Sequence, residues 1–396
     1  MHMVSYLFAN DEQRSLAEDA KRILEKELKP RIEEFENADG GLGTYPMEVH
    51  QKLVDAGYYS IFVPEKWGGI GLDPISLAVI MEEMGKVDCG FAFNFVATVA
   101  NSDKIAMTSM PDEEKQMWYD RVQAGTMGSF NLTEANAGSD AAAIRTTAVF
   151  DEAANEWVIN GTKCFCTGAP KAEYFICLAW TDKTKRASQG VTAFFVEKSR
   201  GVKIGKKENK MGLHLSETSD VIYEDVRIPA DHVIGEVGKG FGIALGGIKG
   251  AGAIVNCCPS LGMAQAALDE AIEYAKVRRQ FGSRIIDHQA VGFMIADMSM
   301  KVAAARALMY DSLRCVVEGV PNNLDMMNKC FVTDTVMSVC MDAVQVLGGY
   351  GYMKDYPVER YMRNAKIFQI FGGTNQIKRK NLMKSIAGRD PEKVRK

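Results

Sequence analysis

The short β-strand patterns of this chain fall in one block between two helical regions, and this order constrains the fold more than any other feature. Four runs, 156–161, 174–181, 191–197 and 221–228, are β-branched or aromatic and are bounded by Gly, Asn, Asp or Pro. The stretches on both sides repeat apolar residues at helical spacing. Because strands and helices do not alternate, the order argues against a doubly wound dinucleotide-binding fold.

Three domains are predicted from this order: residues 1–125 are helical, 126–236 form a β domain, and 237–396 are helical again. Asn10 is placed to cap the first helix, with Gln13 three residues later as the second member of a capping box. No internal repeat and no low-complexity linker interrupts the chain.

Composition excludes several classes of protein. With 396 residues, 47% of them hydrophobic, the chain can bury a large core. Its net charge of −4 is spread over interspersed charges, so neither nucleic acid nor a membrane surface is expected as a partner. We find no signal peptide and no run of about 18 apolar residues, so the protein is predicted to be cytoplasmic. Its nine cysteines lack metal-ligand spacing, which predicts reduced thiols and no metal site.

Two segments before and within the β block contain polar groups suited to a ligand. Thr133, Gly138 and Ser139 lie at a helix-to-strand boundary, where backbone N–H groups are free to bind, although a surface turn explains them equally well. Further on, Phe165 could cover a flat ring while Thr167 donates a hydrogen bond to it. Taken singly, Phe165 fits a core position as well.

The C-terminal part contains four more candidate segments. Residues 342–352, 356–360 and 363–377 combine glycines with amide and hydroxyl donors, a composition that suits a pyrophosphate. Residues 278–282 (Arg-Arg-Gln-Phe-Gly) add charge for a phosphate and an aromatic ring for an adenine, or else form a solvated helix end.

Taken together, these segments resemble a known family. The shared motifs, in the family's order, are Thr133-Glu134 with Ala137-Gly-Ser-Asp140, Asn160-Gly-Thr-Lys163, Arg279-Gln-Phe-Gly282, Gln345-Val-Leu-Gly-Gly-Tyr-Gly351, Tyr356-Pro-Val-Glu-Arg360 and Gly373-Thr-Asn-Gln-Ile377. From Asp11 to about Gly388 the chain resembles the acyl-CoA dehydrogenases, especially the short-chain or butyryl-CoA type. The resemblance implies the acyl-CoA dehydrogenase fold: an N-terminal all-α domain, a middle β-barrel-like domain and a C-terminal four-helix-bundle domain.

The resemblance also implies FAD as cofactor and an acyl-CoA thioester as substrate. The implied FAD contacts are Phe130, Leu132, Thr133, Gly138, Ser139, Phe165, Thr167, Thr374 and Gln376, and, toward the FAD of a neighbouring subunit, Arg278, Gln280, Phe281, Gln345 and Gly349. The implied substrate contacts are Ser139, Phe91, Phe95, Phe371 and Gly372. The resemblance further implies a homotetramer built as a pair of dimers, with an electron-transferring flavoprotein as a possible partner.

One position departs from the family pattern. The family's usual catalytic glutamate precedes a Gly-Thr pair, and here that position is Gly372. Some relatives place the base on the first helix of the C-terminal domain, which is one residue longer here. Depending on the register, that position is Gly252 or Ala251. Neither usual site supplies a carboxylate, so the catalytic residue is unknown.

Several interpretations of this departure stay open. Another carboxylate or a water could replace the base, or the chain could be an inactivated copy. The enzyme could reduce an enoyl-CoA thioester, using a different proton donor. It could instead be a redox-neutral lyase that eliminates an amine, a sulfur oxyacid or carbon dioxide, with Gly372 leaving room for a bulky substituent. From another class, it could be a catalytically silent FAD- or acyl-CoA-binding protein.

Overall fold

The computed structural model describes residues 9–246, 252–320 and 324–388. Its first part is helical, as predicted. Asn10 Oδ1 accepts from the Gln13 backbone N–H at 2.8 Å, and Gln13 Oε1 accepts from the Asn10 N–H at 3.0 Å, which confirms the capping box. The elements are α2 (Asp11–Glu27), η1 (Lys29–Arg31), α3 (Ile32–Gly41), α4 (Met47–Asp55), η2 (Glu65–Trp67), α5 (Pro74–Val87), α6 (Cys89–Asn101), α7 (Asp103–Ala106) and α8 (Asp112–Gln123).

The middle part is one sheet with the strand order β6-β7-β3-β2-β4-β5-β8, and β1 pairs in parallel with β4. Its elements are β1 (Met127–Asn131), η3 (Ala141–Ala143), β2 (Thr147–Asp151), β3 (Glu156–Thr167), β4 (Ala172–Trp180), α9 (Ala187–Gly190), β5 (Val191–Glu197), η4 (Lys198–Arg200), β6 (Lys203–Lys207), β7 (Thr218–Pro229), η5 (Ala230–His232) and β8 (Val233–Ile234). All four predicted strand runs lie in or overlap these strands.

Strand β4 is buried on both faces because its alternate side chains point into two different cores. Tyr174 and Ile176 pack with Trp118 of α8 in the core between the helices and the sheet. Phe175 and Cys177 pack in the second core, which lies within the β domain. The sheet is therefore fixed against the N-terminal helices.

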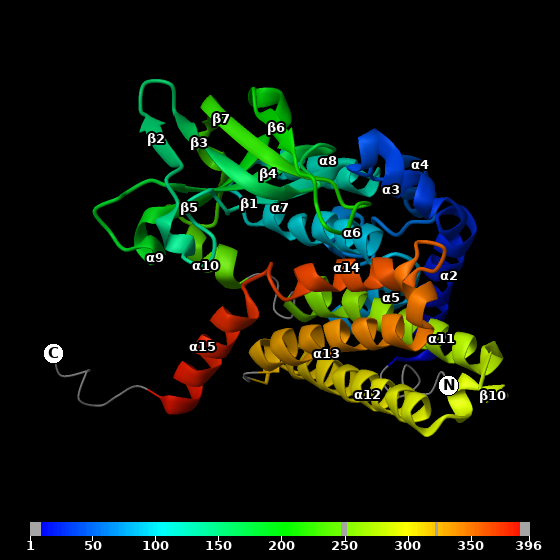
Figure 1. Cartoon of the computed structure of the whole chain (residues 1–396). Coiled ribbons are helices and arrows are strands. Elements are labelled where there is room, and N and C mark those ends of the chain that lie inside the picture. Colours follow the sequence, from blue (N-terminus) through cyan, green and yellow to red (C-terminus); the bar gives the residue numbers. More distant parts are fainter. Residues whose placement is uncertain (1–8, 247–251, 321–323, 389–396) are drawn as a thin grey trace.

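The C-terminal part returns to helices. Its elements are α10 (Gly240–Gly246), the π-helix η6 (Gly252–Cys257), α11 (Cys258–Val277), β9 (Arg279–Gln280), β10 (Ser283–Arg284), η7 (Ile285–Asp287), α12 (Gln289–Val317), α13 (Leu324–Leu347), η8 (Gly348–Tyr352), α14 (Val358–Phe368) and α15 (Asn375–Ala387). Helices α11, α12 and α13 pack on one another and α11 also packs on α5, whereas α15 projects from the end of this bundle (Figure 1). The predicted order of helical, β and helical parts is confirmed.

The stretch Leu324–Tyr352, which includes α13, corrects one expectation. Its most apolar window has a mean hydropathy of 1.4, so by length and composition it could cross a membrane, contrary to the absence of such a run inferred above. Within the described ranges 56% of that window is buried by the rest of the protein. A core helix of a bundle meets the same criterion, and the packing of α13 against α11, α12 and α14 identifies it as one.

Candidate functional site

Helix α6 lies where the three parts of the chain meet. It contacts β1 of the sheet on one side and η6 and α11 of the C-terminal part on the other (Figure 1). The Asp88 carboxylate caps the helix by accepting from the Phe91 N–H at 2.8 Å. From α6, Phe93 reaches Phe371, with ring centroids 4.5 Å apart. This contact joins the helix to the segment 371–374, which contains Gly372, the predicted base position.

A buried ion pair holds the loop that follows β1. Lys163 Nζ donates to Glu134 Oε1 at 2.8 Å and to the Leu132 carbonyl at 3.2 Å, and the Lys163 side chain is 0% exposed. The Glu134 carboxylate also accepts from the Thr146 hydroxyl at 2.6 Å and from the Arg145 N–H at 2.6 Å. Burial acts to raise the pKa of Glu134, but Lys163 and these hydrogen bonds lower it overall, so the carboxylate is held ionised.

This pair explains why two of the shared motifs occur together. Glu134 belongs to the motif at 133–140 and Lys163 to the motif at 160–163. The Cys164 N–H also donates to the Thr133 carbonyl at 2.8 Å. The loop is thus fastened along β3, and Phe130, Leu132 and Thr133 lie half-buried near the end of that strand, while Gly138 and Ser139 are exposed.

Two aromatic residues predicted to touch a cofactor share an unusual backbone. Phe165 has φ +57° and Phe281 has φ +51°, in the left-handed region that a bulky residue rarely adopts. Phe165 lies at a break in the pairing of β3 with β7, and its side chain is 63% exposed. Phe281 is 96% exposed. Strained conformations of this kind concentrate at ligand sites, and both rings are presented outward.

The predicted base position, Gly372, has φ +63°. A Cβ added there would lie 2.8 Å from both Nδ2 and Oδ1 of Asn256. Asn256 belongs to η6 and is 6% exposed. A side chain at residue 372 would therefore require the end of the Asn256 side chain to move, and the expected room for a substrate substituent beside Gly372 stays a prediction.

The π-helix gives a physical account of the extra residue in this part of the sequence. A π-helix bonds residue i to i+5, so it accommodates one more residue than an α-helical turn, and such turns are frequent at functional sites. The alternative base position, Gly252, is the first residue of η6, and Ala251 lies outside the described residues. Asn256 was not among the predicted site residues. The one-residue insertion before it was the feature of the sequence that could have indicated this turn.

The segment after α14 is fastened by a buried polar network. Asn375 donates to Thr333 Oγ1 at 2.9 Å and to Asp334 Oδ1 at 2.8 Å, and Gln369 Nε2 donates to the same Asp334 oxygen at 2.6 Å. Thr374 caps α15 by accepting from the Ile377 N–H at 3.2 Å. The turn that contains Gly372 is therefore held at both ends.

A buried lysine lies beneath the same turn. Lys329 is 1% exposed, donates to the Phe368 carbonyl, and has its Nζ 5.4 Å from the centre of the Phe371 ring. Burial lowers the pKa of Lys329 to about 8. Its ammonium group binds the C-terminal end of α14, where backbone carbonyls lack helical partners.

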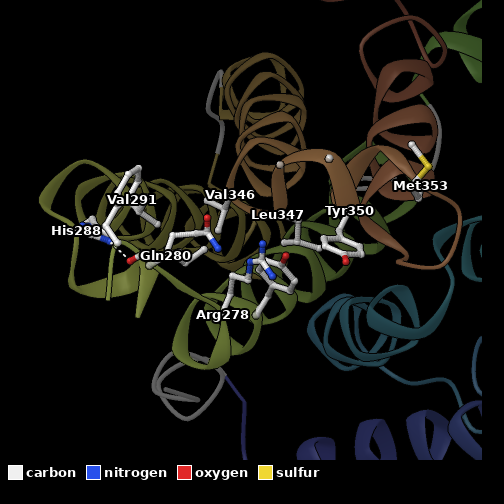
Figure 2. A pocket seen from close by; sticks show the side chains of 13 residues that line it. Arg278, Gln280, His288, Val291, Val346, Leu347, Tyr350 and Met353 are labelled. Atoms are coloured by element: carbon white, nitrogen blue, oxygen red, sulfur yellow. Dashed lines mark hydrogen bonds between the residues drawn. The ribbon is translucent and has the colours of Figure 1, made fainter. Parts of the chain in front are cut away.

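A pocket of about 710 Å³ opens at the other end of the C-terminal bundle (Figure 2). Arg278, Gln280, Phe281 and Gly349, four of the predicted cofactor contacts, line it together with Tyr350. The guanidinium carbon of Arg278 lies 5.8 Å from the centre of the Tyr350 ring. Gln345, the fifth predicted residue of this group, is exposed on α13, next to the lining residue Val346.

The predicted cofactor residues thus form two groups within one chain. The β9–β10 hairpin beside the pocket and helix α15, which follows Thr374, lie at opposite ends of the bundle of α12 and α13 (Figure 1). Gln376 is exposed on α15. The chain alone does not bring the two groups together.

Two of the predicted substrate contacts, Phe91 and Phe95, are buried in the main core. Phe91 and Phe95 are both 0% exposed: the ring of Phe91 stacks on Tyr45 at 5.1 Å, and that of Phe95 meets Tyr59 edge-on at 5.0 Å. They pack in the main core, because they lie on the face of α6 that turns toward the N-terminal helices. Phe93, the phenylalanine between them, is the one of this helix that reaches Phe371.

The fold and these junctions define a three-domain protein, helical, β and helical, with its candidate site where the domains meet. Family models for the N-terminal, middle and C-terminal domains of acyl-CoA dehydrogenase match residues 10–126, 129–226 and 238–387. The chain belongs to the acyl-CoA dehydrogenase family, whose members are flavoenzyme oxidoreductases acting on CH–CH bonds.

Individual relatives agree with this assignment. The chain is 39% identical to the short-chain-specific acyl-CoA dehydrogenase of Megasphaera elsdenii, covering 89% of this chain and 92% of that protein. It is 37% identical to a caffeyl-CoA reductase–Etf complex subunit of Acetobacterium woodii, covering 94% and 97%. The solved structure of butyryl-CoA dehydrogenase from Megasphaera elsdenii superposes with a TM-score of 0.90 at 36% identity, covering 96% and 99%.

Proposed function

We propose that this protein is an FAD-dependent enzyme acting on a short or modified acyl-CoA or enoyl-CoA thioester, with a proton-transfer group other than residue 372. The observation that carries the proposal is the pair Gly372 and Asn256. A Cβ at residue 372, where the resemblance places the family's base, would lie 2.8 Å from both polar atoms of the Asn256 carboxamide, which belongs to η6. A carboxamide donates and accepts hydrogen bonds but does not exchange protons as a carboxylate does.

The residues present fit FAD. Phe165 offers an exposed ring next to Thr167, and the pocket at the far end of the bundle combines the Arg278 guanidinium with the exposed ring of Phe281. FAD bound by these residues would supply hydride transfer. The proposed FAD contacts are those implied by the resemblance: Phe130, Leu132, Thr133, Gly138, Ser139, Phe165, Thr167, Arg278, Gln280, Phe281, Gln345, Gly349, Thr374 and Gln376.

A homotetramer built as a pair of dimers would unite the two groups of contacts. Since they lie at opposite ends of the bundle in one chain, the pocket of one subunit would serve the FAD bound mainly by its neighbour (Figure 1). The high exposure of Phe281 supports this arrangement, because an aromatic side chain that is 96% exposed gains from being covered. We place the protein in the cytoplasm.

Among the possible reactions, reduction of an enoyl-CoA has specific support. The relative from Acetobacterium woodii is named as a caffeyl-CoA reductase and as a subunit of a complex with Etf. In that direction the chain must deliver a proton to the α-carbon, and water or another side chain takes this role in place of residue 372. An electron-transferring flavoprotein is the proposed redox partner.

The lyase hypothesis stays an alternative. It relies on room beside Gly372, and the end of the Asn256 side chain lies close to that position. Of the proposed substrate contacts, Ser139, Phe371 and Gly372 keep a position compatible with that role, since none of them is fully buried. Phe93 joins them through its contact with Phe371.

Anaerobic titration of the FAD-loaded protein tests the proposal. Butyryl-CoA is added to the oxidised form, and crotonyl-CoA or a charged enoyl-CoA to the dithionite-reduced form, while the flavin spectrum and the thioesters are followed. We expect at least one thioester to change the redox state of the flavin. Product formed without any external electron donor or acceptor would instead identify a redox-neutral lyase, and no change with any thioester would identify a silent binding protein.

A further inference from the structure

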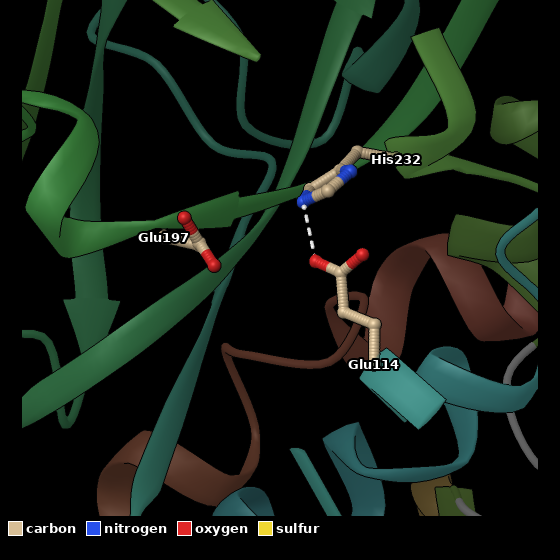
Figure 3. Close-up of side chains that lie close together, drawn as sticks. All are labelled: Glu114, Glu197 and His232. Carbon is tan, nitrogen blue, oxygen red and sulfur yellow. Dashed lines mark ion pairs between the residues drawn. The ribbon is translucent and has the colours of Figure 1, made fainter. Parts of the chain in front are cut away.

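Three side chains far apart in the sequence converge where α8 lies beside β5 and η5 (Figure 3). Glu114 lies in the first turn of α8, Glu197 ends β5, and His232 ends η5. One ligand atom from each lies within 4.8 Å of the others. Because no two of them are close in the sequence, spacing gives no sign of this cluster, and the sequence predicted no metal site.

His232 is the central member. It is 1% exposed, and its Nε2 has no hydrogen-bond partner among the described residues. The Nε2 atom points toward Glu114, with Oε1 of that carboxylate 3.5 Å away (Figure 3). A buried ring nitrogen without a hydrogen bond is costly, so it calls for a partner at this point.

Asp231 determines which nitrogen is available. Its Oδ1 lies 3.0 Å from His232 Nδ1, and in the tautomer that donates the Nδ1 proton to this carboxylate the Nε2 lone pair faces the two glutamates. A carboxylate that orients an imidazole in this way is the usual support of a metal-binding histidine.

The local charges are mostly negative. Asp231, Glu114 and Glu197 surround one imidazole, and among the described residues the cation that pairs with these carboxylates is Arg200, whose Nε lies 2.8 Å from Glu197 Oε2. The Glu114 and Glu197 side chains are 29% and 17% exposed, so solvent ions can enter from their side.

From this geometry we infer that Glu114, Glu197 and His232 bind a divalent transition-metal cation, with Zn²⁺ as the first candidate. One imidazole and two carboxylates suit Zn²⁺, which takes three protein ligands and a water in tetrahedral geometry. Glu114 belongs to the N-terminal helices and the other two ligands to the β domain. The cation therefore acts as a structural link between these two parts, and none of its ligands is in the proposed site of thioester chemistry.

Equilibrium dialysis of the FAD-loaded protein against Zn²⁺, followed by metal analysis, tests the inference. The variants are His232→Gln, Glu114→Gln and Glu197→Gln. The control is His214→Gln, because His214 also faces a glutamate, Glu36, at 3.6 Å, but Arg360 and Arg363 lie beside that glutamate. We expect one equivalent of Zn²⁺ per chain in the wild type and the control, and its loss in the three site variants.

Two further readouts distinguish binding at this site from Zn²⁺ bound elsewhere on the chain. Zn²⁺ should raise the melting temperature of the wild type and the control by a few degrees and leave the Glu197→Gln variant unchanged. The Co²⁺ form should lack the strong near-ultraviolet absorption of thiolate ligation, which excludes the free cysteines as ligands. Equal Zn²⁺ binding by the wild type and His232→Gln, or no stoichiometric binding at all, would overturn the inference.

Discussion

Asn256 stands where a side chain on residue 372 would begin: a Cβ at Gly372 would lie 2.8 Å from both polar atoms of the Asn256 carboxamide. The two positions are therefore coupled. A side chain at residue 372 and the Asn256 side chain of η6 would compete for the same space.

A glutamate introduced at this position should work only when Asn256 is also replaced. In Gly372→Glu alone, the new side chain meets Asn256 and the left-handed backbone adds about 1–2 kcal/mol of strain. We expect Gly372→Glu/Asn256→Gly to oxidise butyryl-CoA about 100-fold faster than Gly372→Gln/Asn256→Gly, because a positioned acid–base group contributes at least that much. Steady-state assays with an artificial electron acceptor measure this ratio, and equal rates would show that more than the base is missing.

Breaking the Lys163–Glu134 pair should destabilise the protein strongly. Lys163→Met leaves a buried carboxylate without its cation, which costs about 3–5 kcal/mol. The matched control is Lys203→Met, because Lys203 and Glu224 form a pair on the same sheet whose side chains are 64% and 62% exposed. That change should cost at most about 1 kcal/mol. Denaturant unfolding followed by circular dichroism compares them, and similar losses would mean that the buried pair does not anchor the loop.

Lys329 should make stability rise at alkaline pH. Its folded pKa of about 8 lies below the ordinary value of 10.5, so between these values the unfolded chain binds more protons than the folded one, and stability increases with pH. At about 1.4 kcal/mol per pKa unit, the gain is on the order of 3 kcal/mol. Unfolding of wild type and Lys329→Met at pH 7 to 10.5 measures the difference. A difference that does not change over this range would contradict a depressed pKa.

Removing the guanidinium from the pocket should weaken FAD retention. Arg278→Leu loses a charge-assisted contact worth about 1.5–3 kcal/mol, which corresponds to a roughly 10- to 100-fold loss of affinity. Arg284→Leu is the control, since Arg284 lies on the same hairpin but pairs with Asp287 at 2.8 Å. Flavin-to-protein ratios after dilution and desalting compare them. If both variants lose flavin alike, the pocket does not bind the cofactor through Arg278.

Secondary-structure features could be predicted from the sequence where residues close together in the chain determine them. The Asn10 capping box follows from two residues three positions apart, and it is confirmed. The domain limits at 125 and 236 stay predictions. Contacts between distant segments could not be predicted from the sequence. The burial of Phe91 and Phe95 depends on how α6 is rotated about its axis. The place of Asn256 beside Gly372 depends on a π-helical turn.

The central claim is that this chain is an FAD-dependent enzyme acting on an acyl-CoA or enoyl-CoA thioester without a carboxylate at residue 372. Its flavin content and the response of that flavin to thioesters test this claim most directly. The purified protein, reconstituted if necessary, should contain one FAD per chain, and its flavin absorbance should change under anaerobic conditions when the matching acyl-CoA or enoyl-CoA is added, with Gly372 left unmodified. Protein that stays colourless after incubation with FAD, or a flavin that responds to thioesters only after a glutamate is placed at residue 372, would contradict the account.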